Sequence, residues 1–192
     1  MRRRAFCALA MAGAMLSASP FAMAGVPLRT MLRLAGFGAS DVLAVDPAQL
    51  GTAVLADTCV GAANDKGPRM LFDFTPDSGK GFAPFQMQVR FRARDAAPAS
   101  LKLEPAPVGK HWLIFVPDET GLQEMRAVQD KLHALKEAKA QTGKGGAMGF
   151  SMKLEGLDSH CASDPDIEHW LQIKRADGAF ELWNGKLSEA SR

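Results

Sequence analysis

Hydrophobic and polar residues alternate most regularly between Phe85 and Arg92. Apolar and polar side chains occupy opposite faces of this segment: Phe85, Met87, Val89 and Phe91 against Gln86, Gln88, Arg90 and Arg92. This pattern predicts a strand with one buried and one solvated face, as in antiparallel sheets. Residues 70–75 alternate in the same way, and turn-forming residues separate the two segments, so we predict a hairpin.

Four further segments carry strand patterns. Residues 112–116 are continuously apolar, which predicts a central strand buried on both faces. Residues 148–155 alternate and predict a half-buried strand. Residues 169–174 and 179–183 flank an Ala-Asp-Gly turn and predict a terminal hairpin.

Helical spacing occurs in two regions. A long helix is predicted over residues 117–140, with acids in its first turn and a stripe formed by Leu122, Met125, Val128, Leu132 and Leu135. Nearer the amino terminus, Asp46 and Pro47 form a good helix start, and helical spacing continues to Asp57. Residues 40–45 predict a short helical turn before it. Residues 95–109 are rich in proline and alanine and are interpreted as a connector.

Strands therefore come in runs instead of alternating with helices, which favours an α+β fold. We predict an antiparallel sheet of about five to six strands, with one long helix packed on its apolar face and a helical amino-terminal lead. Residues 25–192 are expected to form a single domain.

The first 24 residues are typical of a cleavable signal peptide. Three arginines precede an apolar stretch over residues 5–16, and Ala22-Met23-Ala24 offers small residues at a cleavage site. The stretch is too short to span a bilayer, which takes about 20 residues. Cleavage after Ser19, or a buried amino-terminal helix, are the alternatives.

Export changes the charge balance. Residues 1–24 hold three arginines and no acid, so their removal takes the formal net charge from +2 to −1. A near-neutral chain has no electrostatic footprint for nucleic acid, and no second apolar run reaches membrane-spanning length. We expect an exported protein without a transmembrane segment, in the periplasm more than in the medium.

Cys59 and Cys161 are the two cysteines that remain after cleavage, since Cys7 lies in the leader. An even count in an exported chain favours a disulfide. The bridge would close a loop of roughly 100 residues, which contributes about 4–5 kcal/mol in the chain-entropy model. Two buried free thiols are the alternative.

The loop around Cys161 holds metal-ligand residue types, and the candidates are Asp164, Asp166, Glu168 and His169. A calcium loop that started at Asp164 would need glycine and glutamate where His169 and Arg175 stand. Zinc would need four ligands at a recognised spacing. We expect a solvated loop and no metal or other cofactor.

Catalytic motifs do not stand out either. Residues 149–153 hold a serine two residues after a glycine but lack the second glycine of a nucleophile elbow. A triad assembled around His111 or His169 would leave no sequence signature, so it stays open.

Three tryptophans, Trp112, Trp170 and Trp183, are the candidates for a contact surface, with peripheral packing as the alternative. The favoured function is a non-catalytic exported domain that binds or assists another envelope protein or ligand. One alternative is an exported hydrolase with a site assembled only in three dimensions. The other is a small-molecule or metal carrier that uses the Cys161 loop or the space between helix and sheet.

Overall fold

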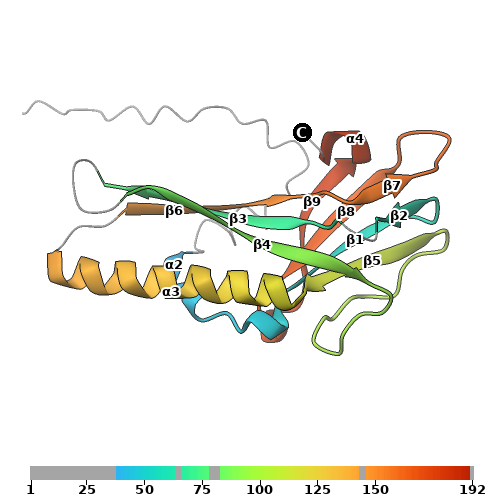
Figure 1. Cartoon of the computed structure of the whole chain (residues 1–192). Helices are drawn as coiled ribbons and strands as arrows, with labels where there is room; N and C mark the ends of the chain where they lie inside the picture. The colour runs from blue at the N-terminus through green and yellow to red at the C-terminus, as the bar shows by residue number, and fades with distance from the viewer. Residues whose placement is uncertain (1–37, 64–65, 78–82, 143–145, 191–192) are drawn as a thin grey trace, which may run out of the picture.

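The structure is a computed structural model that describes residues 38–63, 66–77, 83–142 and 146–190 (Figure 1). The proposed signal peptide, residues 1–24, lies outside the described residues. The described chain is α+β, as expected from its runs of strands.

The main sheet of the described chain contains seven antiparallel strands in the order β6-β3-β4-β5-β1-β8-β9, and it curls into a half-barrel (Figure 1). The strands are β1 (Gly51–Asp57), β3 (Arg69–Pro76), β4 (Phe85–Arg94), β5 (Lys110–Pro117), β6 (Gly146–Lys153), β8 (Asp166–Gln172) and β9 (Phe180–Lys186). A small second sheet pairs β2 (Val60–Ala62) with β7 (Leu157–Ser159).

The helices are one long element and several short ones. They are α2 (Ala39–Leu43), α3 (Glu119–Thr142) and α4 (Leu187–Ala190), with 3-10 turns η1 (Pro47–Gln49) and η2 (Arg175–Asp177). Among the described residues, neither α3 nor any of the shorter helices combines the length and the apolarity that a membrane span requires.

The predicted arrangement of five to six strands with the long helix on an apolar face is wrong. The main sheet has seven strands, and it curls instead of presenting one flat face to a helix. Helix α3 contacts mainly β4 and lies inside the curl along that part of the sheet. The strand count of the main sheet was too low because β1 was interpreted as a helix.

The predicted helical lead is wrong from Gly51 onward. Asp46 does cap a turn, since its Oδ1 accepts a hydrogen bond from the Ala48 N–H at 3.0 Å, but that turn is η1. The chain then becomes β1, which lies between β5 and β8 and buries its first six residues. A strand covered on both faces shows no apolar-polar alternation, so its composition can imitate a helix.

The other predicted elements are present in the structure. β3 and β4 pair as the antiparallel hairpin, β5 is the central strand of the seven, and β8 and β9 form the terminal hairpin. The strand predicted over residues 148–155 is β6, and the long helix predicted over residues 117–140 is α3, which begins and ends two residues later.

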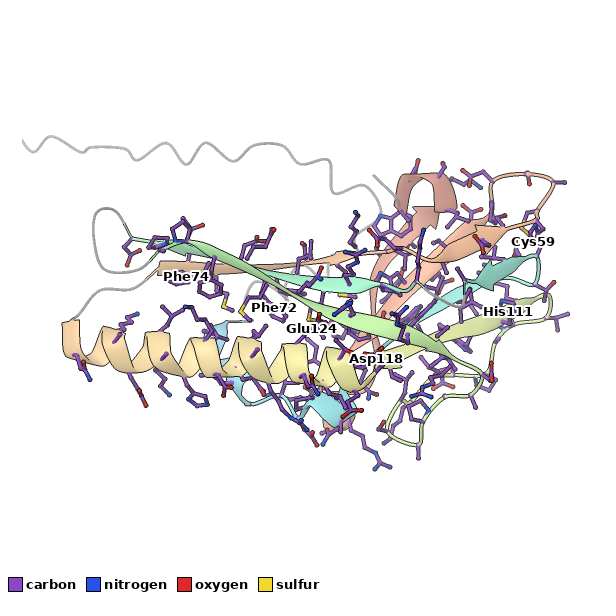
Figure 2. All side chains as sticks on the ribbon, viewed as in Figure 1. Cys59, Phe72, Phe74, His111, Asp118 and Glu124 are labelled. Atoms are coloured by element: carbon purple, nitrogen blue, oxygen red, sulfur yellow. A yellow bond between two sulfur atoms is a disulfide. The ribbon has the colours of Figure 1, made fainter. Side chains whose placement is uncertain are left out.

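The main core lies in the curl, between the sheet and α3. Figure 2 shows Phe72 and Phe74 extending from β3 toward the helix, where Met125, Val128 and Leu132 are buried in the same cluster as Phe72. A smaller second core lies on the outer face, where Leu101 of the segment between β4 and β5 covers Ala53 and Ile114. The segment of residues 95–109 is therefore packed on the sheet and is more than a connector.

Helix α3 is anchored to β4 at its first turns. Asp118 caps the helix, since its Oδ1 accepts from the Gly121 N–H at 2.8 Å, and this bond lowers the pKa of its carboxyl group below the usual value. The Glu124 carboxylate accepts from both the backbone N–H and the guanidinium of Arg90. Both acids lie at the end of α3 nearest β5 (Figure 2).

The disulfide prediction is confirmed: Cys59 and Cys161 are bonded across a sequence separation of 102 residues. Cys59 lies in the turn between β1 and β2, and Cys161 follows β7. A backbone hydrogen bond joins the same two segments, because the His160 N–H donates to the Cys59 carbonyl at 3.0 Å. The bridge therefore closes the small β2–β7 sheet at its end.

Candidate functional site

A groove of about 540 Å³ opens on the outer face of the main sheet. Its floor is formed by β1, β5 and β8, and its walls by residues 102–107 and by the turn at residues 178–179. We call it the indole groove, because Trp112 and Trp170 lie in it. Its size is within the range of ordinary ligand sites, about 300–1,000 Å³.

Strand register places the two indoles side by side. Trp112 of β5 pairs with Leu55, and Trp170 of β8 pairs with Ala53, so both tryptophans point to the outer face on either side of β1. Their rings meet edge to face, with centroids 6.0 Å apart and planes at 87°. This is one of the favoured arrangements of aromatic pairs.

Both indole N–H groups are already satisfied within the groove. The Trp112 Nε1–H donates to the Glu104 carbonyl at 2.7 Å, and the Trp170 Nε1–H donates to Glu168 Oε2 at 3.1 Å. These bonds fix the orientation of each ring and leave its apolar surface for contacts with another molecule. The Glu168 carboxylate retains further acceptor capacity beside Trp170.

The proline-rich wall is held to the sheet by Gln172, whose side chain is completely buried on β8. Its amide group donates to the carbonyls of Gln49 and Ser100, at 3.1 and 2.8 Å, and accepts from the Lys102 N–H at 3.2 Å. A buried polar side chain needs such partners. Sequence patterns did not single out Gln172, although it is a polar residue between the apolar residues Leu171 and Ile173.

Trp183 does not belong to the groove. It pairs with His169 across β8 and β9, and its side chain packs against the main core on the inner face. A bulge between His169 and Trp170 shifts the register here, so alternation counted along the sequence cannot place these tryptophans relative to each other. The predicted surface of three tryptophans is therefore a pair and a separate residue.

The metal candidates have separate partners. Asp164 accepts hydrogen bonds from the backbone and hydroxyl of Ser188, Asp166 forms an ion pair with Lys186 at 2.8 Å, and Glu168 binds Trp170. His169 points to the opposite, inner face of β8. Within the described ranges, no group of three or more His, Cys, Asp or Glu side chains could hold a metal ion.

The two histidines considered for catalysis lie in the sheet. His169 Nε2 lies 2.6 Å from Thr52 Oγ1, and the Thr52 hydroxyl in turn donates to the Trp170 carbonyl at 2.7 Å. His169 is 3% exposed and Thr52 is 0% exposed, so a substrate does not reach this pair. Burial lowers the pKa of His169 to about 4, which keeps the imidazole neutral near pH 7.

His111 lies on β5, which is separated from β8 by β1, near the end of the molecule that carries Cys59 (Figure 2). Its buried Nε2 atom has no hydrogen-bond partner among the described residues.

Comparison with protein-family models, with curated proteins and with solved structures finds no significant match for this chain. The candidate site therefore depends on its own geometry.

Proposed function

We propose that this protein is an exported, non-catalytic binding domain whose indole groove accepts an extended peptide segment of another envelope protein. The observation that carries the proposal is the convergence of Trp112 and Trp170 from two different strands into one groove. Aromatic residues in a depression are typical anchors of protein interfaces. Proline-rich and extended peptides are recognised by grooves of this kind.

The charges at the rim of the groove favour a peptide that combines apolar residues with a basic side chain. Glu104 and Glu168 contribute carboxylates against a single cation, Lys102. An arginine or lysine side chain placed over an indole face gains about 0.5–1 kcal/mol at an exposed site. Next to the groove, the Val108 side chain is fully exposed at the outer rim, which extends the apolar contact area beyond Pro107.

The disulfide supports export, since such bonds persist in oxidising compartments. The leader-like residues 1–24 favour the same conclusion, and the periplasm is the destination that we propose.

The test uses tryptophan fluorescence in a Trp183→Phe background, so that emission comes only from the two groove tryptophans in residues 25–192. The probe is a ten-residue peptide of proline and leucine with one central arginine. We expect saturable binding that shifts the emission, and binding at least tenfold weaker when glutamate replaces the arginine. Equal affinities for the two peptides, or binding of neither at millimolar concentration, would contradict the proposal.

A charge-neutral variant of the rim sharpens this test. Glu168→Gln keeps a carbonyl oxygen for the Trp170 N–H but removes the charge, and we expect about threefold to fivefold weaker binding of the arginine peptide. Glu137→Gln, on the exposed side of α3 away from the groove, is the matched control and should leave the affinity unchanged.

A further inference from the structure

A second pocket, of about 270 Å³, lies at the other end of the molecule, between α2, the last turns of α3 and the strands β3 and β6. We call it the helix-end pocket. Its wall consists of apolar side chains, namely Leu43, Phe74, Leu132, Leu135 and Met148. Figure 2 shows Phe74 extending from β3 toward this part of α3.

Two lysines, Lys136 and Lys139, stand at the mouth of the helix-end pocket. Together with Leu132 and Leu135 they follow helical spacing on one side of α3, so the leucines form the wall and the exposed lysines form the rim. Among the described residues, no carboxylate lines the pocket. Neither lysine forms an ion pair with another described residue.

The combination of an apolar wall and a rim of two lysines differs from the lining of an ordinary surface depression. Lysines that cover apolar surface usually extend their stems along it and keep the ammonium groups in water. Here the two ammonium groups border the opening of an apolar pocket. A molecule with an apolar chain and an anionic head can therefore contact the apolar wall and the lysines at the same time. A cationic head would meet two like charges, and a neutral head would leave them unused.

We infer that the helix-end pocket binds an anionic amphiphile, with its acyl or alkyl chain among Leu132, Leu135 and Met148 and its head group against Lys136 and Lys139. This site is separate from the indole groove and does not depend on the peptide-binding proposal, because the two pockets share no lining residue.

The chain-length test uses calorimetric titration of the whole mature protein with unbranched carboxylates from six to fourteen carbons, below their micelle concentrations. Each buried methylene is worth about 0.8 kcal/mol, so the affinity should rise about fourfold per carbon and level off when the pocket is full. An affinity that does not change with chain length would overturn the inference.

The head-group test compares decanoate with decanol and with decyltrimethylammonium. We expect decanoate to bind about threefold to tenfold more tightly than decanol, as two exposed ion pairs allow, and the cation to bind most weakly. In the double variant Lys136→Gln/Lys139→Gln, decanoate and decanol should bind equally well. Arg126→Gln, another exposed cation of α3 outside the pocket, should keep the difference.

Two other results would overturn the inference. One is equal binding of all three head groups, which would indicate a nonspecific apolar patch. The other is a concentration-dependent dimer in sedimentation whose formation prevents decanoate from binding, which would make a second copy of this chain the occupant of the pocket.

Discussion

At the scale of single residues, two buried polar side chains have clear structural roles. Gln172 and His169 both lie on β8, on opposite faces of the sheet. Gln172 holds the wall of the indole groove, and His169 is bound to Thr52 in the main core. Polar groups in such places are stabilising only while their partners and protonation states are kept.

His169 makes the stability of the protein sensitive to mild acid. Its pKa is about 4 in the folded state and about 6.5 when unfolded, so the unfolded chain binds the additional proton. The free energy of unfolding should therefore fall as the pH decreases from about 6.5 to 4, by a total of about 3 kcal/mol. Urea denaturation at a series of pH values measures this.

His169→Gln removes the titrating group, so the slope in that window should largely disappear. His133→Gln, an exposed histidine of α3, is the control and should keep the slope. A wild-type protein equally stable at pH 6.5 and pH 4 would contradict the assignment.

At the scale of elements, the contact between α3 and β4 determines where the helix lies. A Cβ atom built at Gly121 would lie 2.1 Å from the Arg90 carbonyl oxygen, so the helix approaches the strand backbone directly at this residue. The same two elements are joined by the bonds between Arg90 and Glu124. Glycine here allows a close packing that any side chain would prevent.

Gly121→Ala should destabilise the protein by about 1–3 kcal/mol, although alanine is the better helix former, because the backbone at Arg90 cannot move aside freely. Gly149→Ala in β6 is the matched control, since its Cβ would meet nothing within 4 Å. Thermal unfolding of both variants measures the difference. Equal stability of Gly121→Ala and Gly149→Ala would contradict the close contact between α3 and the backbone of β4 at Gly121.

Sequence patterns predicted these elements unequally, for physical reasons. β4 and α3 each have one solvated side, so their periods are visible. β1 has none, and its Thr52 and Val54 are covered from the inner face while Ala53 is covered from the outer. The indole groove depended on strand order and on the bulge beside Trp170, neither of which is local information. Its tryptophans could therefore be selected as candidates but not grouped.

At the scale of the whole molecule, one covalent link joins distant parts of the chain. Cys59 and Cys161 lie 102 residues apart, and the segment between them includes β3, β4, β5, α3 and β6. In the chain-entropy model, a link over such a distance restricts the unfolded chain strongly.

Reducing this disulfide should lower the free energy of unfolding by about 4–5 kcal/mol. Guanidinium denaturation with and without reductant measures the change, and the double variant Cys59→Ser/Cys161→Ser should unfold at one midpoint under both conditions. Identical midpoints of the wild-type protein in the two conditions would show that the bridge does not form.

The buried amide of Gln172 also has a consequence for the entropy of the proposed peptide binding. Two hydrogen bonds of Gln172, to the Ser100 carbonyl and from the Lys102 N–H, attach the proline-rich wall to β8, so this wall of the groove is held in place before a ligand binds. In the peptide complex that we propose, the ordering entropy is then lost mainly by the peptide, and a peptide stiffened by prolines loses little. A chain cyclised in the extended form should therefore associate more tightly than its linear counterpart.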